Sequence, residues 1–422
     1  MLQAIKGMND ILPDEVALWR RIEETARAVY DAYGYQEIRT PLLEKTELFA
    51  RGVGETTDIV EKEMYSFADR GGDNLSLRPE GTAGVVRALI EHKLYGADPE
   101  VRVYYIGPMY RRERPQKGRY RQFHQIGVEA FGNAAPEVDA ELMAMLYQFL
   151  REIGLPDVVL DVNTLGDQTD RPGYLDALRA HFGQHRAELC EDCLRRIERA
   201  PLRLLDCKNE RCHVVALQAP LVLDHLGAES RAHFDGVRRA LDRLQVPHRI
   251  NPRVVRGLDY YTRTVFEAVS TGLGSQNAIC GGGRYDNLVE QLGGPALPAV
   301  GYAQGIERLV MLVADKLAIR PTPAVALVPV AAGDREQALA IAAALRGRRI
   351  RCIVDLAGRS VKAQLRRANR AQATFAVVLG EEELKRGQVE IKPLVEGEVA
   401  EQVTIDGLVE RLATRCAGRA TG

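Results

Sequence analysis

The stretch Tyr110–Gln125, YRRERPQKGRYRQFHQ, carries the densest chemical pattern in the chain, with six basic residues and one acid, Glu113. Pro115 and Gly118 predict a loop between two β-strands, VRVYYIG before it and QFHQIGVEAF after it. Six neighbouring cations repel one another, and water screens that repulsion only in part. The loop is therefore either a solvated hairpin tip or an anion site, and the planar donors of arginine favour phosphate.

The strand after this loop has an unusual face. Side chains alternate along a strand, so Phe123, Gln125, Gly127 and Glu129 point the same way. Gly127 leaves a gap between two polar groups, and a small ligand could lie on the backbone there. The alternative is that this face simply meets solvent, because a core-facing Gln and Glu would be costly without partners.

Outward from this hairpin, the chain reads as strands and helices in blocks. Apolar spacing predicts helices over 13–33 and 136–153, with short β runs between them. Residues 171–249 have helical spacing and little β character, which predicts a helical insertion. This pattern favours an α+β fold with a mostly antiparallel sheet.

After Pro321 and Pro323 the pattern changes to alternating strands and helices, which predicts a separate α/β domain. The predicted division is a core over 1–170, a helical insertion over 171–249, the core continued over 250–320, and a C-terminal domain over 324–422.

Composition excludes some classes of protein. The 422 residues include 57 Lys and Arg against 58 Asp and Glu, a net charge of −1 that excludes a polycation or an acidic tail. No apolar run reaches the roughly 18 residues of a membrane span, and MLQAIKGMND lacks the features of a signal peptide. Seven cysteines are an odd number for a disulfide framework, so we expect a cytoplasmic protein with reduced thiols.

Three further clusters could carry chemistry. Glu80 and Thr82 lie in LRPEGT, and RGLDYY, residues 256–261, opens a strand. In GYAQGIERL, two glycines precede a predicted helix whose first turn carries Arg308. A helix N-terminus with an arginine can anchor phosphate, although the pattern is weak alone. Walker, Rossmann and nucleophile-elbow motifs are missing from the sequence.

These motifs, together with RGLDYYTRTVFE and CGGGRYD, resemble in order and spacing those of the histidyl-tRNA synthetase family, and the resemblance covers essentially the whole chain. It implies a class II antiparallel-sheet catalytic core with a helical insertion, and a C-terminal α/β anticodon-binding domain. The implied reaction is ATP-dependent ligation of L-histidine to tRNA(His) through a histidyl-adenylate, giving AMP and pyrophosphate. Mg²⁺ on ATP and a homodimer built on residues 13–41 are implied as well.

The resemblance also assigns residues. The implied catalytic residues are Arg111, Arg256 and Gln125. Histidine would be bound by Glu80, Thr82, Arg111, Gln125, Glu129, Arg256, Tyr260, Tyr261 and Tyr285. ATP would be bound by Arg111, Glu113, Arg119, Arg121, Phe123 and Arg308. The tRNA would be contacted by Arg114, Gln116, Lys117, Lys362, Arg366 and Arg370.

The assignment for histidine makes physical sense. A neutral imidazole has one donor and one acceptor nitrogen, which suit the carboxylate of Glu129 and the hydroxyl of Tyr261. A site built on such paired hydrogen bonds rejects side chains that lack them.

Two related proteins are alternatives. The regulatory subunit of ATP phosphoribosyltransferase is a synthetase-like paralogue that typically lacks the anticodon domain and loses active-site residues. Here that domain is predicted, and Arg111, Glu113, Arg256 and Arg308 are present. Another class IIa enzyme, such as a threonyl or prolyl synthetase, is disfavoured by RGLDYY and Glu129.

Four cysteines in the insertion remain ambiguous. Cys190-x₂-Cys193 and Cys207-x₄-Cys212-His213 are spaced like a zinc ribbon. The alternative is ordinary reduced thiols in a helical segment. We favour the thiols and predict no metal site, because the chemistry of the family needs no such metal.

The near-zero charge is unevenly spread. Residues 321–422 carry 16 basic and 12 acidic residues, a net +4, which leaves −5 for the rest. Lys362, Arg366 and Arg370 recur at i, i+4 on one predicted helix face. That face is either merely solvated or a stripe that follows the phosphates of tRNA.

Overall fold

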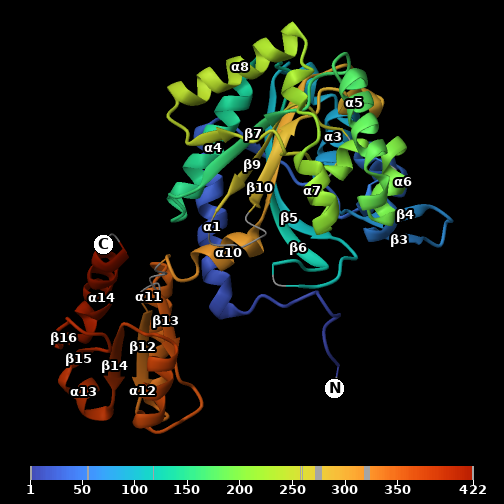
Figure 1. Cartoon of the computed structure of the whole chain (residues 1–422). Helices are drawn as coiled ribbons and strands as arrows, with labels where there is room; N and C mark the ends of the chain where they lie inside the picture. Colours follow the sequence, from blue (N-terminus) through green and yellow to red (C-terminus); the bar gives the residue numbers. More distant parts are fainter. Residues whose placement is uncertain are drawn as a thin grey trace. The chain divides into compact units, whose positions relative to one another are not determined.

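The computed structural model describes residues 2–54, 57–116, 118–256, 258, 260–270, 278–317 and 324–420. The chain divides into two compact units, Met1–Ala318 and Ile319–Gly422 (Figure 1). Among the helices of the described residues, none combines the length and apolar character needed to cross a membrane.

An eight-stranded sheet forms the centre of the first unit. In spatial order its strands are β1 (Gln36–Glu37), β5 (Val101–Tyr110), β6 (Gln122–Phe131), β11 (Ala299–Gly305), β10 (Ala278–Arg284), β9 (Thr262–Val269), β7 (Val159–Thr164) and β8 (His248–Ile250). Only the outer pairs β1–β5 and β7–β8 are parallel. The predicted α+β fold with a mostly antiparallel sheet is confirmed, and β5 and β6 flank the predicted loop.

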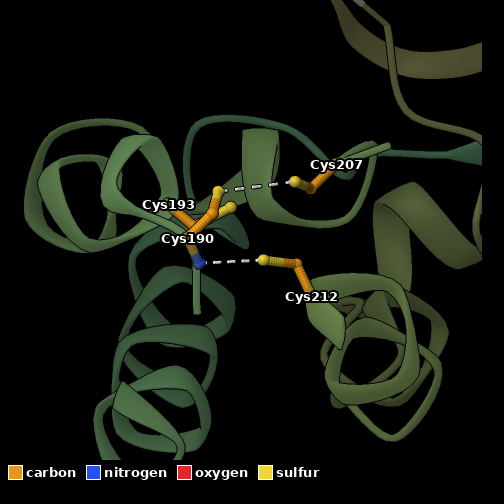
Figure 2. Close-up of side chains that lie close together, drawn as sticks. All are labelled: Cys190, Cys193, Cys207 and Cys212. Atoms are coloured by element: carbon orange, nitrogen blue, oxygen red, sulfur yellow. Dashed lines mark hydrogen bonds between the residues drawn. The ribbon is translucent and has the colours of Figure 1, made fainter. Parts of the chain in front are cut away.

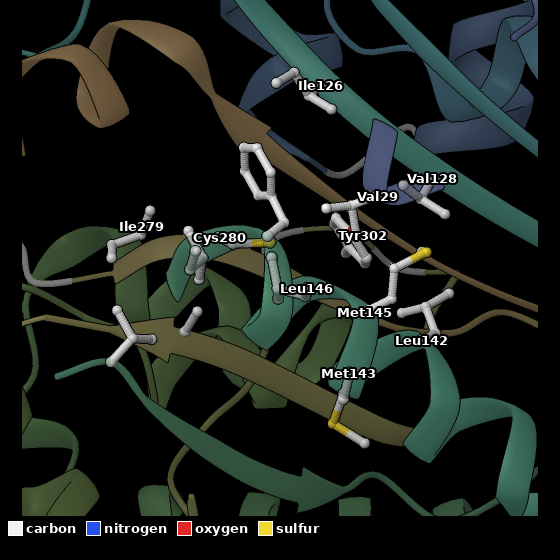
Figure 3. Packing of buried hydrophobic residues seen from close by; sticks show 14 of the residues in the cluster. Val29, Ile126, Val128, Leu142, Met143, Met145, Leu146, Ile279, Cys280 and Tyr302 are labelled. Carbon is white, nitrogen blue, oxygen red and sulfur yellow. The ribbon is translucent and has the colours of Figure 1, made fainter. Parts of the chain in front are cut away.

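Four helices share a core with one face of this sheet. They are α1 (Pro13–Ala32), α4 (Pro136–Glu152), α8 (Ala228–Arg243) and α10 (Ile306–Val313), and their apolar sides share one core with the sheet. Both α1 and α4 begin at a proline, whose fixed φ suits the first helical position. Figure 3 shows Leu142 and Met145 of α4 in the same cluster as Val128 of β6.

The opposite face of the sheet is covered only in part. Helices α3 (Thr82–Glu91) and α9 (Leu288–Gln291) pack on it through a second core that includes Val85, Leu89 and Tyr105. A small sheet of β2 (Leu43–Lys45), β4 (Asn74–Leu77) and β3 (Tyr65–Ala68) lies beside α2 (Thr46–Val53) and the π-helix Ile59–Glu63. Strand alternation therefore directs Val128 into the first core and Glu129 toward the less covered face.

The predicted insertion, 171–249, takes part in two different cores. Helices α5 (Arg171–Gln184), α6 (Glu191–Arg199) and α7 (Glu210–Leu217) pack around a core of their own, which runs from Tyr174 to Val222. Helix α8 instead contributes Phe234, Val237 and Leu241 to the core of the large sheet. Figure 1 shows α8 beside α4, and the two helices are in contact.

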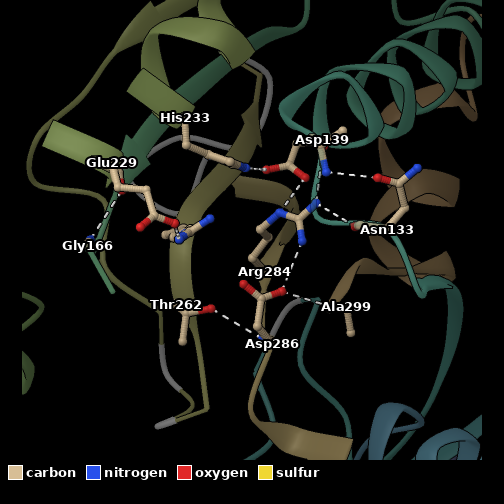
Figure 4. Close-up of polar contacts among 12 residues, drawn as sticks. Asn133, Asp139, Gly166, Glu229, His233, Thr262, Arg284, Asp286 and Ala299 are labelled. Atoms are coloured by element: carbon tan, nitrogen blue, oxygen red, sulfur yellow. Dashed lines mark hydrogen bonds and ion pairs between the residues drawn. The ribbon is translucent and has the colours of Figure 1, made fainter. Parts of the chain in front are cut away.

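A buried ionic network ties the sheet to α4 (Figure 4). Arg284, at the end of β10, pairs with Asp139 in the first turn of α4 at 2.8 Å and with Asp286 at 3.0 Å. Its remaining donors reach the carbonyl oxygens of Asn133 and Ala135. The side chains of Arg284 and Asp139 are fully buried, so the arginine of the GGRYD motif has a structural role, which is to hold β10 against α4.

The second unit is an α/β domain, as predicted. Its sheet has the order β13 (Arg351–Val354), β12 (Ala324–Pro329), β14 (Phe375–Leu379), β15 (Gln388–Pro393) and β16 (Glu401–Thr404). The first three strands are parallel, and the last two add antiparallel. Its helices are α11 (Asp334–Gly347), α12 (Val361–Arg370), α13 (Glu381–Arg386) and α14 (Ile405–Ala420).

Candidate active site

A cavity of about 500 Å³ opens on the less covered face of the large sheet. Most of the residues singled out from the sequence line it together. They are Glu80, Thr82, Arg111, Glu113, Arg119, Phe123, Gln125, Glu129, Arg256, Tyr260, Tyr261, Tyr285 and Arg308. These residues span more than 220 positions of sequence, and strand order is what gathers them.

Glu129 lies at one end of this cavity and is almost completely buried. Its carboxylate accepts hydrogen bonds from Thr82 Oγ1, at 2.7 Å, and from the Tyr285 hydroxyl. Gly301 on β11 makes room for it, because a Cβ there would lie 1.9 Å from Glu129 Oε2. Burial raises the pKa of Glu129 to about 8, and the two hydroxyl donors only moderate that rise.

Glu80 combines a structural contact with a place in the cavity wall. Its two carboxylate oxygens accept the backbone N–H groups of Thr82 and Ala83, each at 2.8 Å. These are orphan donors at the start of α3, so Glu80 caps that helix. Burial raises the pKa of Glu80, while these backbone donors oppose the rise. Thr82, which was predicted to contact histidine, donates its hydroxyl to Glu129.

The expectation of a ligand lying over Gly127 is wrong. Tyr105 is the cross-strand partner of Gly127, and its ring occupies the space above that glycine. A Cβ on Gly127 would lie only 2.1 Å from the Tyr105 ring, and Gly81 is equally close to it. The glycine therefore admits a buried aromatic side chain rather than a ligand.

Arg256 also lines the cavity. It pairs with Glu267 of β9 and lies 5.8 Å from the centre of the Tyr261 ring. Burial alone would lower its pKa, but the neighbouring Tyr261 and Glu267 hold that pKa above its ordinary value. A Cβ on Gly281 would collide with the guanidinium. The rings of Tyr260, Tyr261 and Tyr285 pack around the same corner, with centroids 4.7 to 6.5 Å apart.

The predicted loop supplies a second group of charges. Glu113 is held by Arg119 at 3.2 Å and by Arg111 at 3.9 Å. Arg111 also donates to the Pro79 carbonyl oxygen and lies 5.2 Å from the centre of the Phe123 ring. The loop thus directs a cation–carboxylate–cation group and an aromatic ring into the cavity.

Arg308 occupies the first turn of α10, as the sequence predicted. Its Nη1 donates to the Ala278 carbonyl oxygen at 2.6 Å. Burial and the nearby charge of Arg119 lower its pKa. Gln125 lies in the same cavity, and its buried Oε1 has no hydrogen-bond partner among the described residues. Such an atom needs a partner from a ligand or from water.

Several predicted contacts lie elsewhere. Arg121 does not line the cavity but donates to the backbone oxygen of Glu113, which braces the loop. Arg114 and Gln116 are exposed on the loop, and Lys117 lies outside the described residues. The second unit carries the other predicted tRNA contacts, exposed on α12, and none of them has an ion pair within the described ranges: Lys362, Arg366 and Arg370.

The structure also adds cavity residues that the sequence analysis missed. Glu267 partners Arg256, and a lone carboxylate inside the apolar run VFEAV could have drawn attention to it. Asp206 and Lys208 reach the cavity from the helical segment. Nothing in their local pattern pointed there, because that contact depends on how the segment folds over the sheet.

Comparison with known families decides among the alternatives. Residues 7–309 match the family described as histidyl-tRNA synthetase, and residues 324–415 match the anticodon binding domain. The chain belongs to the histidyl-tRNA synthetase family. The match covers the large sheet, the helical segment and every residue of the cavity.

Individual members of the family agree. The chain is 48% identical over 417 residues to a histidine–tRNA ligase of Syntrophotalea carbinolica, covering 99% of each. It is 52% identical over 395 residues to one of Anaeromyxobacter dehalogenans, covering 93% of this chain and 95% of that one. The crystal structure of apo S. aureus histidyl-tRNA synthetase superposes with a TM-score of 0.83 at 37% identity, covering 98% of this chain and all of that one.

These comparisons identify the activity as that of a histidine–tRNA ligase. Its substrates are histidine, ATP and tRNA(His). The predictions of family, fold class and reaction are confirmed.

Proposed function

We propose that the cavity binds histidine at its Glu129 end and ATP at its Phe123 end. Both residues lie on the same face of β6, six positions apart, which is about 20 Å along a strand. That length suits two ligands laid end to end with their reacting groups near Gln125. The observation that carries this proposal is a difference between the two ends of this face of β6. Glu129 is hydrogen-bonded to Thr82 and Tyr285, whereas Phe123 lies beside Arg111, which is near Glu113.

At the histidine end, Glu129 accepts the imidazole N–H and Tyr261 donates to the other ring nitrogen. Tyr260 and Tyr285 close the pocket around the ring. Glu80 and the unpaired Oε1 of Gln125 accept from the α-ammonium group. Thr82 holds the Glu129 carboxylate in place.

At the ATP end, cations do the catalytic work. In the first step the histidine carboxylate attacks the α-phosphorus and pyrophosphate leaves. The attacking carboxylate is already an anion, so no general base is needed. Arg111 and Arg256 stabilise the charge that spreads over the equatorial oxygens, and Arg308 holds the γ-phosphate. Phe123 stacks on adenine, and Glu113 faces the same end. Arg119 fits the ATP group better than Arg121, because only Arg119 reaches the cavity.

Mg²⁺ enters as part of the ATP substrate, on the β- and γ-phosphates. Magnesium in such sites is typically held by one or two protein carboxylates together with phosphate oxygens. Glu113 and Glu267 are cavity carboxylates of that kind.

In the second step, the terminal ribose hydroxyl of tRNA(His) attacks the adenylate and releases AMP. The exposed loop residues Arg114 and Gln116, together with Lys117, would approach the acceptor end of the tRNA. The α12 stripe, defined as Lys362, Arg366 and Arg370, would follow phosphates near the anticodon.

The assembly of the chain is part of the same proposal. The catalytic core would span 1–170 and 250–320, with the insertion 171–249 between its two parts and an anticodon-binding domain from residue 324. Within the insertion, 174–222 has a core of its own. A homodimer would form through α1 and the run to Pro41, where the neighbouring Leu42 and Leu43 are exposed. We place this enzyme in the cytoplasm.

The test separates the two ends of the cavity. Amino-acid-dependent pyrophosphate exchange should require histidine, with threonine and proline inactive. Glu129→Gln should raise KM for histidine and leave KM for ATP unchanged, while Phe123→Ala should do the reverse. If either variant raises the KM of the other substrate instead, the direction assigned to the cavity is wrong.

A further inference from the structure

The helical segment brings four cysteines together from three stretches of chain (Figure 2). Cys190 is the residue before α6, Cys193 is in its first turn, Cys207 follows the short helix Pro201–Leu204, and Cys212 is in α7. Their Sγ atoms all lie within 4.8 Å of one another. These four residues are called the thiol cluster below.

The spacing of the sulfurs matches a tetrahedral metal site. Zinc–sulfur bonds of about 2.3 Å in a tetrahedron place neighbouring sulfurs ~3.8 Å apart. Cys190 Sγ and Cys207 Sγ are 3.9 Å apart. The Cys190 backbone N–H donates to Cys212 Sγ at 3.1 Å, a contact that would stabilise a thiolate. One sulfur pair thus has nearly the separation that a bound ion would impose, and no pair in the group is more than 4.8 Å apart.

Neither disulfides nor unrelated thiols account for this arrangement as well as a metal does. All four thiols are free cysteines, and a 3.9 Å separation is far from the roughly 2 Å of a disulfide. The remaining cysteines, Cys280, Cys352 and Cys416, belong to no such group within the described ranges. The segment 174–222 also has only a small core of its own, and units near this size commonly need a metal or disulfides.

We propose that the thiol cluster is a structural zinc site. Four cysteine ligands and no free position make such a site closed, so it is not catalytic. Sequence spacing alone left zinc and plain thiols open and favoured thiols, and the convergence of all four sulfurs reverses that preference. Tetrahedral sulfur coordination also fits an iron–sulfur centre, so the test distinguishes the two metals.

The site would act on the catalytic cavity through one loop. Cys207 lies between Asp206 and Lys208, and both neighbours line the cavity. A metal bound to Cys207 would fasten this loop to the starts of α6 and α7. The proposed zinc therefore fixes the position of two charged groups that line the cavity, without touching a substrate.

The first experiment measures metal content. The full-length chain, produced without a metal-binding tag in zinc-containing medium and purified with a thiol reductant, should contain about one zinc per chain by elemental analysis. Cys193→Ser/Cys212→Ser should contain none. The matched control Cys352→Ser/Cys416→Ser removes two cysteines outside the cluster and should keep its zinc. Iron in place of zinc, or full zinc in the cluster variant, would overturn the assignment.

A second experiment uses the unmodified protein, in case the cluster variant does not fold. Titration with an organomercurial should release zinc to a chromogenic indicator as the cluster thiols are modified. Co²⁺ exchanged into the site should show the visible bands of tetrahedral thiolate coordination. If the protein contains no metal and all four thiols of the cluster react freely while it is folded, the proposal is wrong.

Discussion

Two arginines from two motifs, Arg284 of GGRYD and Arg256 of RGLDYY, lie in contrasting surroundings. Arg284 is fully buried, forms ion pairs with two carboxylates and donates hydrogen bonds to two carbonyl oxygens. Arg256 retains 21% exposure, lines the cavity and pairs with the carboxylate of Glu267. An arginine enclosed by protein oxygens can only hold structure, whereas one that faces a cavity can still bind a phosphate.

The largest expected effect is on stability, at Arg284. Arg284→Met leaves Asp139 buried without its partner and should lower the free energy of unfolding by about 3–5 kcal/mol. Denaturant unfolding measures this loss, and the folded fraction should keep normal KM values. Adding Asp139→Leu removes the stranded charge and should recover much of the loss. If Arg284→Met/Asp139→Leu is as unstable as Arg284→Met alone, the unpaired charge of Asp139 is not the cause of the loss.

Arg256 should show the opposite behaviour. Arg256→Ala should slow histidine-dependent pyrophosphate exchange by ~10²–10³, because one fixed charge at the α-phosphate is lost. Histidine binding by calorimetry should remain measurable, and unfolding should change far less than in Arg284→Met. Arg256→Lys keeps the charge without the planar donors, so its exchange rate should lie between those of the wild type and Arg256→Ala. Near wild-type exchange in Arg256→Ala would remove Arg256 from the mechanism.

The third prediction concerns pH and the buried carboxyl of Glu129. Since burial raises the pKa of Glu129 to about 8, this group holds a proton at neutral pH. An imidazole N–H needs the ionised form, so KM for histidine should fall roughly tenfold from pH 7 to 9, as the ionised fraction rises. Glu129→Gln should lose this dependence, and subtracting its profile removes the titration of histidine itself. Identical profiles in both proteins would refute the role of Glu129.

The smallest effect per residue should come from the α12 stripe, which is exposed rather than buried. Replacing Lys362, Arg366 and Arg370 with Ala should raise KM for tRNA and flatten its salt dependence, by a logarithmic slope of about 0.7–0.9 for each phosphate that is no longer neutralised. Pyrophosphate exchange needs no tRNA and should stay unchanged. Lys385→Ala/Arg386→Ala on α13, where both cations are already ion-paired, is the control. If the α12 and α13 variants lose tRNA affinity equally, the loss reflects only the change in overall charge and the α12 stripe has no specific role.

Much of the fold followed from local pattern. The strand predicted over QFHQIGVEAF has the bounds of β6, and helix 136–153 differs from α4 by one residue at its end. Such elements are set by side-chain period and by prolines at helix starts, which neighbouring residues alone decide. The motif residues of the cavity were also predictable, because they resemble those of a known family.

Other features depended on contacts between distant segments. Strand pairing sets Tyr105 over Gly127 and turns the expected ligand gap into packed core. Helix α8 has the period of its neighbours but joins the core of the large sheet. Arg119 and Arg121 look alike in sequence, and only loop geometry brings one of them into the cavity.

The sequence by itself determined the family, the reaction, the two-part fold and most of the residues around the cavity. Tertiary structure decided which arginine is buried in an ionic network, where Glu129 finds its partners, and that the four sulfurs of the thiol cluster lie within 4.8 Å of one another. The physical reason is the distance along the chain over which each interaction acts. Periodicity and capping act over a few residues, whereas burial, pKa and ligand geometry depend on segments brought together from far along the chain.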